Sequence, residues 1–392
     1  MKIIYPSYKN CSVNISNSIL KHYGLATEHP TLQTVDQALE KNYKNVILIV
    51  YDGLGSTIVQ QHLGNDSFLS QHKVQDITSV FPSTTTAATT SIVTGLTPAE
   101  HGWLGWDLYF ESVDQVVTTF FNTVKGQENE QVADHHLAKT ELSITTMIDR
   151  INQLGTAQGY WISPFAEDIL AAAVKADSKE FINLINYDFN HLDTLFEKLE
   201  TLCTTDDRKF IYAYSVEPDN LMHQLGTNDE RVTKLINYLD KKTAELAEKL
   251  DDTLLIVTAD HGHITAGEYF FLNEYPEIQN MLRRRTSIEA RCVNFFVKDG
   301  MHDHFEMAFK KAFGDYFILY TKKEVKDQQL FGPRIPHEKF DSFLGDYLAV
   351  ATSDKSIMDH RYSNPHAGTH AGLLEDETVV PLIMIEKPKR GV

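Results

Sequence analysis

The chain has 392 residues, of which 42% are hydrophobic and 10% aromatic, a composition that supports a large core and excludes global disorder. Its formal net charge of −18 disfavours binding to nucleic-acid polymers and to anionic membranes, because like charges repel. This length allows two or three domains, or one large α/β domain with insertions.

The N-terminal stretch MKIIYPSYKN lacks the apolar region of a signal peptide. No apolar run approaches the ~18 residues that a membrane span needs. The three cysteines, Cys11, Cys203 and Cys292, have no paired spacing, so neither a disulfide framework nor a cysteine zinc site is expected. We therefore expect a soluble cytoplasmic protein with no membrane partner, and the sequence leaves its oligomeric state open.

Three apolar runs are each followed by acidic residues or histidines. The run at 44–55, KNVILIVYDGLG, predicts a parallel strand buried on both faces, and the runs at 209–226 and 252–263 have the same form. Because ligands bind at the carboxyl ends of parallel strands, we expect the polar residues there to converge. These residues are Asp52, Asp219, His223, Asp260 and His261.

The segment 227–250 between the last two strands has helical periodicity. Thr227 and Glu230 have the spacing of a capping box at its start. The order strand, helix, strand predicts a βαβ unit and hence a parallel sheet.

The pattern loosens after residue 264, and residues 265–350 read as an inserted α+β subdomain that mixes short strands and helices. The C-terminal run VVPLIMIE predicts a last core strand. We expect residues 1–392 to form one catalytic domain that includes the insert.

Carboxylates and histidines near these strand ends favour a metal site. Asp219 and His223 are four residues apart, so one helical turn can present both to one ion. His366 and His370 follow in a glycine-containing loop. Such ligands suit zinc, with manganese or iron as competitors. Each fragment alone also fits a structural role, such as a turn or helix cap for Asp52.

The segment 81–95, FPSTTTAATTSIVTG, holds six threonines and two serines between apolar residues. Hydroxyl-rich runs are usually loops or linkers. This one continues into the apolar SIVTGL, so it raises the question of whether one hydroxyl is a nucleophile.

Five motifs in this order resemble the alkaline phosphatase superfamily, most closely its type I phosphodiesterase/nucleotide pyrophosphatase branch. They are VYDGLG, FPSTTTAATTSIVTGLTPAEHG, VEPDNLMHQLG, TADHGH and GTHAGLLEDETVVPLI, which span about 44–263 and 360–386. The resemblance implies a doubly wound, mostly parallel α/β sheet with helices on both faces and a smaller inserted α+β subdomain.

The resemblance also implies roles for individual residues. Thr85, ten residues before Gly95, corresponds to the family nucleophile at the start of a helix and also contacts a metal. Thr84 and Thr86 are the neighbours that a shifted register would select. Two divalent ions are implied, zinc first and manganese or iron as alternatives. One would bind Asp52, Asp260 and His261, and the other Asp219, His223 and His370.

One position departs from the family pattern. The family's diesterases usually carry an asparagine twenty-one residues after the nucleophile, and here that position is Trp106, which offers one donor and no acceptor. Trp106 either packs in the core, as expected for Trp103, Tyr109 and Phe110, or lines the substrate site.

The function implied is that of a two-metal phosphohydrolase. It would cleave phosphodiester or pyrophosphate bonds of nucleotide-like or other small organic phosphates through a phosphothreonine intermediate. The alternatives within the superfamily are a phosphomonoesterase and a phosphonate hydrolase. The alternative from another class is a non-catalytic, metal-binding regulatory protein.

Overall fold

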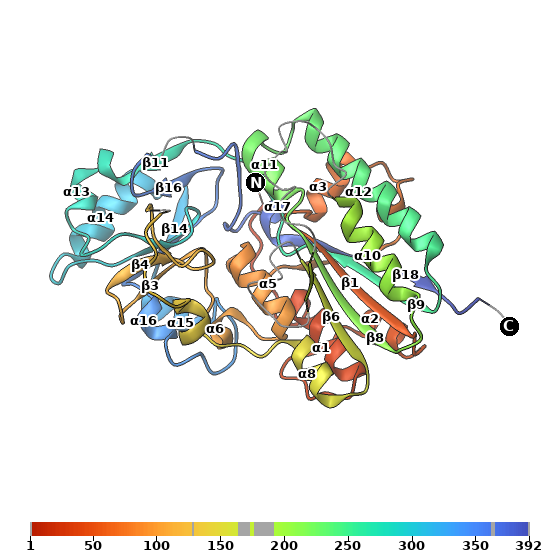
Figure 1. Cartoon of the computed structure of the whole chain (residues 1–392). Coiled ribbons are helices and arrows are strands. Elements are labelled where there is room, and N and C mark those ends of the chain that lie inside the picture. Colours follow the sequence, from red (N-terminus) through yellow and green to blue (C-terminus); the bar gives the residue numbers. More distant parts are fainter. Residues whose placement is uncertain (1, 128, 164–172, 176–191, 362–364, 391–392) are drawn as a thin grey trace.

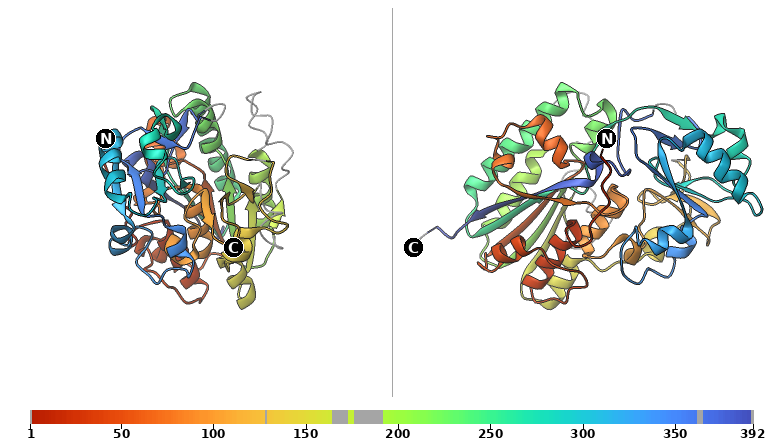
Figure 2. Two further views of the ribbon diagram at one scale, coloured as in Figure 1. Left: turned by 90° about the vertical axis from the view of Figure 1, so that its left-hand side faces the viewer. Right: turned by 180° about the vertical axis from the view of Figure 1, so that it is seen from behind.

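The chain folds into two lobes side by side (Figure 1). The structure is a computed structural model that describes residues 2–127, 129–163, 173–175, 192–361 and 365–390. Within the described residues, each lobe is organised around a seven-stranded sheet. The C-terminus projects from the larger lobe, on the side away from the smaller one (Figure 2).

The sheet of the larger lobe is mainly parallel and has the order β2-β18-β9-β1-β8-β6-β7. Strands β1, β8 and β9 are buried along their whole length, as their continuous apolar sequences predict. Strand β18 runs antiparallel to both of its neighbours. The bounds are β1 Asn45–Tyr51, β2 Lys73–Thr78, β6 Gln158–Ser163, β7 Ala173–Lys175, β8 Lys209–Ser215, β9 Thr253–Thr258 and β18 Val379–Lys387.

Helices cover both faces of this sheet (Figures 1 and 2), which confirms the predicted α/β fold class. One group of mutually contacting helices is α1 Ser12–His22, α2 Gln33–Leu39, α5 Thr85–Thr94 and α8 Met147–Leu154. The other is α3 Ser56–His62, α4 Phe68–Gln71, α10 Asp193–Cys203, α11 Asp219–Leu225 and α12 Glu230–Lys249. The short α17, Glu375–Thr378, contacts α3.

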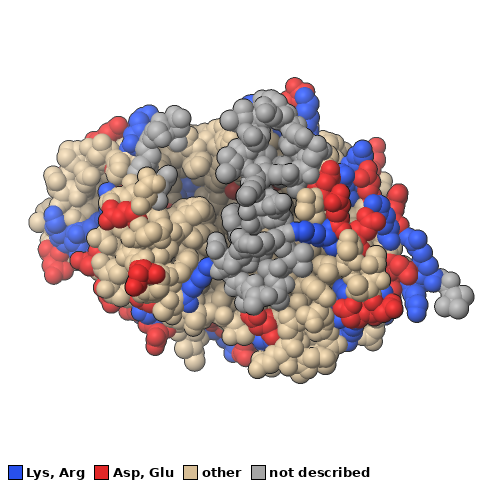
Figure 3. All heavy atoms as spheres, in the orientation of Figure 1, with Lys and Arg blue, Asp and Glu red and all other residues tan. Residues whose placement is uncertain are grey.

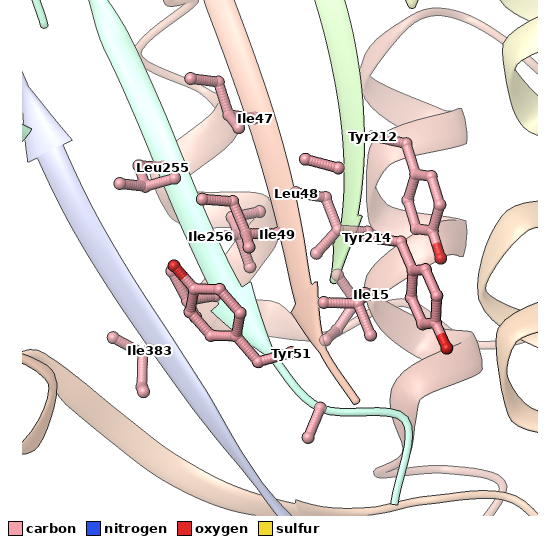
Figure 4. Close-up of a cluster of buried hydrophobic side chains, with 14 of the residues drawn as sticks. Ile15, Ile47, Leu48, Ile49, Tyr51, Tyr212, Tyr214, Leu255, Ile256 and Ile383 are labelled. Atoms are coloured by element: carbon pink, nitrogen blue, oxygen red, sulfur yellow. The ribbon is translucent and has the colours of Figure 1, made fainter. Parts of the chain in front are cut away.

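Strand β1 is central to the main core because its side chains alternate between two packed faces. Ile47 and Ile49 point to one face, and Leu48 points to the other, where Ile15 of α1 and Tyr212 of β8 also lie (Figure 4). All five side chains are at most 1% exposed. Burial on both faces holds the polar end of the strand in a fixed place.

The sheet of the smaller lobe has the order β14-β15-β13-β12-β3-β4-β5, with antiparallel pairing throughout. The predicted insert, 265–350, contributes four of its strands, and residues 107–124 contribute the other three. The second sheet is therefore built from two separate parts of the chain. Its strands are β3 Asp107–Phe110, β4 Gln115–Thr118, β5 Thr123–Val124, β12 Ser287–Ile288, β13 Cys292–Phe295, β14 Phe317–Thr321 and β15 Tyr347–Ala351.

Short helices and two small sheets complete this lobe and its connections. The helices are α6 Pro98–His101, α7 Leu137–Glu141, the 3₁₀ helix η3 Leu272–Glu274, α13 Pro276–Gln279, α14 His302–Phe313, α15 Lys322–Asp327 and α16 Phe340–Phe343. The small sheets pair β10 Ile264–Thr265 with β17 Gly368–Thr369, and β11 Tyr269–Phe271 with β16 Ser356–Met358.

The predicted capping box of α12 is wrong. Asp229 is the N-cap residue, and its side chain accepts a hydrogen bond from the backbone N–H of Arg231 at 2.9 Å. The Thr227 hydroxyl instead lies 2.9 Å from the Thr265 hydroxyl. Asp229 directly precedes the first turn of α12, and aspartate is at least as good an N-cap residue as threonine, so Asp229 rather than Thr227 caps the helix.

Charged side chains of both signs lie interspersed on the two lobes in the view of Figure 3, so the net charge of −18 is not one continuous acidic patch on that face. None of the helices in the described part of the chain combines the length and apolar character needed to cross a bilayer.

A buried ion pair ties the smaller lobe to the larger one. Arg291, just before β13, donates from Nε to Glu377 Oε1 at 2.6 Å and from Nη2 to Glu377 Oε2 at 2.8 Å. The carbonyl oxygens of Lys355 and Ser353 accept the remaining bonds, each at 2.6 Å. Both charged side chains are fully buried, so each depends on the other.

Replacing Arg291 by alanine should lower the free energy of unfolding by roughly 3–5 kcal/mol, because it leaves the Glu377 carboxylate buried and unpaired. The double variant Arg291→Met/Glu377→Leu should recover much of this loss, since it removes both charges. Denaturant unfolding of the three proteins measures the difference. Equal stability of the wild type and Arg291→Ala would contradict this account.

Candidate active site

Three carboxylates meet where three neighbouring strands of the large sheet end. Asp52 follows β1, Asp260 follows β9, and Asp219 opens α11 after β8. The backbone N–H of Asp219 donates to the carbonyl of Asp52 at 2.9 Å. Gly53 permits this approach: its φ is +75°, and a Cβ there would lie 2.9 Å from the Cβ of Asp219.

Four histidines surround these carboxylates and share one orientation. In each ring Nδ1 faces a backbone carbonyl, at 2.9 to 3.2 Å, so Nε2 is directed toward the carboxylates. A carbonyl partner at Nδ1 fixes the tautomer in which Nε2 carries a lone pair, as in metal-binding histidines. The pairs are His223 with Gly368, His261 with Gly262, His263 with Ile264 and His370 with Ser83.

The first group of possible ligands is the predicted set Asp52, Asp260 and His261. His261 Nε2 lies 3.1 Å from Asp52 Oδ1 and 3.5 Å from Asp260 Oδ2. The candidate ligand atoms of the three residues all lie within 4.8 Å of one another.

The second group centres on Asp219. Its Oδ2 lies 3.2 Å from Nε2 of His223, and its Oδ1 lies 3.1 Å from Nε2 of His263 and 3.7 Å from Nε2 of His370. Asp219 thus contacts both predicted partners, His223 and His370, but the sets whose ligand atoms all lie within 4.8 Å of one another are Asp219, His223 and His263, and Asp219, His261 and His370. The His370 ring also stacks on His261 with centroids 3.7 Å apart, so the two groups adjoin.

The donor set fits divalent metal ions. Four buried polar atoms here have no hydrogen-bond partner among the described residues: Asp52 Oδ1, Asp219 Oδ1, Asp260 Oδ2 and His263 Nε2. Buried polar atoms are normally paired, and buried charges are normally paired or bound to metals. Mixed imidazole and carboxylate ligands suit zinc and other transition metals.

The titration of these groups reflects the same crowding. Burial, and to a smaller extent repulsion from Asp219, hold the pKa of Asp52 well above its ordinary value. Burial, and to a smaller extent repulsion from Asp52, likewise raise the pKa of Asp260. Burial lowers the pKa of His263 to about 4 and that of His370 well below its usual range, so both rings are neutral. Neutral imidazole is the form that binds metals.

Thr85 is the first residue of α5 and contacts the first group. Its hydroxyl donates to Asp52 Oδ2 at 3.4 Å and lies 3.1 Å from His261 Nε2. The first backbone N–H groups of a helix have no partner within the helix, so they and the helix dipole favour an anion.

Two other threonine hydroxyls of α5 have backbone partners within the helix. Thr89 donates to the carbonyl of Thr85 at 2.6 Å, and Thr94 donates to that of Thr90 at 2.7 Å. Only the Thr85 hydroxyl, among the threonines of α5, is seen to contact the candidate ligands in the described structure.

Trp106 belongs to an aromatic surface near the site. It is half-buried, and its ring packs edge-on against Phe120 and Phe121, with centroids 5.7 and 5.6 Å apart. Phe121 is 58% exposed. By contrast, Trp103 is buried, and its indole N–H donates to the carbonyl of Leu142 at 3.0 Å. The expected core role thus fits Trp103, as it does the buried Tyr109 and Phe110.

Glu289 of the smaller lobe also lies beside the start of α5. Its Oε1 accepts hydrogen bonds from the Thr84 hydroxyl at 2.6 Å and from the backbone N–H of Trp106 at 2.9 Å. The residue keeps some solvent exposure, but protein atoms surround its carboxyl group, and this desolvation raises its pKa to about 7.

Sequence reasoning missed three of these side chains. His263 stands in the quoted motif TADHGH, so its alternation with His261 along an extended chain was an available signal. Tyr214 of β8 donates a hydrogen bond to Asp52 Oδ2. Its position near the end of a predicted strand was only a weak indication that it contacts the site. Glu289 has no surrounding motif. His366, the alternative to His370, is exposed, although its ring lies 4.5 Å from that of His223.

Comparison with known proteins identifies the family and the fold. A family model described as type I phosphodiesterase/nucleotide pyrophosphatase matches residues 46–373. The solved structure of murine ectonucleotide pyrophosphatase/phosphodiesterase 5 has a TM-score of 0.64 and 17% identity and covers 88% of each chain. An inactive threonine-to-alanine variant of that murine protein, in complex with AMP, has a TM-score of 0.62 and 16% identity over 88% of this chain and 91% of its own.

Phosphonoacetate hydrolase from Sinorhizobium meliloti, in complex with phosphonoformate, has the same fold. Its TM-score is 0.63 at 16% identity, over 88% of this chain and 90% of its own. A search of curated proteins found no match.

The fold and the comparisons define a hydrolase of the alkaline phosphatase superfamily that acts on phosphoric ester bonds. Because the family match spans most of the chain, the chain belongs to the type I phosphodiesterase/nucleotide pyrophosphatase family.

Without metal, the protein should lose stability between about pH 6.5 and 9. Burial lowers the pKa of His223, but Asp219 outweighs this and raises it to about 9. The folded state therefore keeps a proton that the unfolded state releases near pH 6.5, and this stabilisation, up to about 3 kcal/mol, is lost as pH rises through the folded pKa.

Thermal unfolding of chelator-treated and zinc-saturated protein across this pH range measures the effect. The zinc-saturated protein should show a much smaller decline, because a ligating histidine is already neutral. His223→Gln should remove most of the decline from the chelated form. If stability declines equally in the chelated wild type, the zinc-saturated wild type and chelated His223→Gln, His223 is not the source of the decline.

Proposed function

We propose that the two groups of ligands hold two divalent ions, zinc first and manganese or iron as alternatives, and that the protein hydrolyses phosphodiester or pyrophosphate bonds of small organic phosphates. Asp52, Asp260 and His261 form one site, and Thr85 contacts it. Asp219, His223 and His370 form the other. The observation that carries the proposal is the set of buried carboxylate and imidazole atoms that face one another without hydrogen-bond partners.

When bound, such ions neutralise negative charge at a phosphoryl group and lower the pKa of coordinated hydroxyl and water oxygens. This chain supplies the nucleophile and its orientation. Thr85 Oγ1 attacks phosphorus, the bond from phosphorus to the leaving oxygen breaks, and a phosphothreonine forms. Water then cleaves that ester, which releases the phosphorylated product and restores the threonine hydroxyl.

The start of α5 positions both the hydroxyl and the phosphoryl group. Thr85 begins the helix, so free backbone N–H groups of the first turn lie beside its hydroxyl. Asp52 accepts from this hydroxyl at 3.4 Å, which orients it toward the ligand groups. A threonine requirement has support from the murine relative, which is inactive as a threonine-to-alanine variant.

Trp106 and the exposed Phe121 favour a substrate with an organic group on both sides of phosphorus. Aromatic rings bind apolar or planar ester groups, whereas a bare phosphate monoester presents only charged oxygens to them. The AMP complex of the murine relative shows a nucleotide bound in that protein. We therefore place a nucleotidyl or aryl phosphodiester first among substrates.

Replacing Thr85 by alanine should lower kcat by ~10³-fold or more while leaving the fold and the metal content unchanged, because it removes the nucleophile and little packing. Thr86→Ala is the matched control, since that buried hydroxyl has no hydrogen-bond partner among the described residues. Turnover of p-nitrophenyl thymidine phosphate and elemental analysis supply the measurements. Near-normal kcat in Thr85→Ala would exclude the covalent mechanism at this residue.

The zinc-loaded enzyme should hydrolyse bis-p-nitrophenyl phosphate and p-nitrophenyl thymidine phosphate with a higher kcat/KM than p-nitrophenyl phosphate. The reason is that the aromatic surface contacts the second ester group, which the monoester lacks. Phosphonoacetate tests the phosphonate alternative in the same assay. A clear preference for the monoester or for phosphonoacetate would overturn the diester assignment and leave the role of Thr85 standing.

A further inference from the structure

Glu289 comes from the smaller lobe but is fixed against the two segments that define the phosphoryl site. Its Oε1 binds the hydroxyl of Thr84, the residue before the nucleophile, and the backbone N–H of Trp106. The carboxyl group therefore lies next to the start of α5, between that helix and the aromatic surface.

The backbone before Glu289 adopts a rare conformation. Ile288 is fully buried and has a φ of +75°, a region that β-branched residues seldom occupy. It also lies tightly against Gly105, where an added Cβ would come within 2.8 Å of Ile288 Cγ2. Such strain persists only where surrounding structure enforces it, and it is frequent at ligand-binding positions.

The hydrogen bond to Glu289 also prevents the Thr84 side chain from capping α5. Thr84 is the N-cap residue, but its side chain makes no capping hydrogen bond to the helix. Its hydroxyl donates to Glu289 instead. The first N–H groups of α5 therefore remain available to an anion, while a carboxylate stands beside the same place.

We propose that Glu289 is a specificity-determining residue that discriminates against dianionic phosphate monoesters and favours monoanionic diesters. This inference rests on the proposed function. A second charge on the non-bridging oxygens of a monoester meets the fixed carboxylate, whereas a diester carries an ester group in its place. Glu289 stays partly exposed, so a ligand in the site can approach it.

The size of the effect follows from Coulomb's law. One additional unit charge some 6 Å from a carboxylate, at an effective dielectric constant of about 20, changes the relative affinity by ~10- to 100-fold. Glu289→Gln removes this charge and keeps the shape. The amide oxygen can still accept from Thr84 and Trp106.

The experiment compares methyl p-nitrophenyl phosphate with p-nitrophenyl phosphate, which share a leaving group and differ by one methyl group and one charge. Zinc-loaded wild type, Glu289→Gln and Glu277→Gln are assayed near pH 9, where Glu289 is ionised because its pKa is about 7. Glu277 lies exposed on α13, so its variant makes the same charge change on the same lobe. In Glu289→Gln, the diester-to-monoester ratio of kcat/KM should fall by ~10-fold or more through a gain on the monoester.

An unchanged ratio in Glu289→Gln, with both esters still hydrolysed, would overturn the inference and leave the proposed function intact. An equal shift in Glu277→Gln would also overturn it, by showing a general effect of net charge. If the wild type hydrolyses neither ester, the proposed function fails. Binding affinity then tests the inference. The affinities of both esters are compared between Thr85→Ala and the double variant Thr85→Ala/Glu289→Gln. The second substitution must strengthen binding of the monoester relative to the diester, and equal changes in the two affinities would refute the inference.

Discussion

The mutual repulsion of three buried carboxylates is the constraint on which the rest of the larger lobe depends. Asp52, Asp219 and Asp260 follow neighbouring strands, and no lysine or arginine is seen to pair with them in the described structure. Burying such charges without compensation is costly. Four imidazoles with their Nε2 atoms turned inward, and a helix start directed at the same place, leave cations as the natural means of compensation.

The smaller lobe supplies what this arrangement lacks. In the proposed function, the larger lobe holds the ions and supplies Thr85 as the nucleophile. Trp106, Phe121 and Glu289 all lie outside the large sheet, and they add an apolar surface and a negative charge. The Arg291 to Glu377 pair holds the two lobes in register. Under the two proposals above, chemistry and selectivity belong to different parts of the fold.

Local patterns in the sequence were sufficient for the core and for the clustering of the candidate ligands. The runs that became β1, β8 and β9 are buried on both faces, and such strands are continuous in sequence. Pairing between distant segments could not be predicted from the sequence. Ile288 pairs with Asp107 and so joins two stretches of the smaller sheet, but neither stretch carries a pattern that identifies the other as its partner. Glu289 was missed for the same reason. His263 stood in a recognised motif, but its role depends on the direction of a ring, which sequence does not give.

The divided origin of the smaller sheet has a consequence for how this lobe can be engineered. Strands β3 to β5 follow soon after α5 in the sequence, and β12 to β15 follow more than 150 residues later. Removing only the later segment would leave β3 paired with β4 alone and expose its other edge, which invites aggregation. Transfer of this lobe to another protein therefore requires both segments to be moved together.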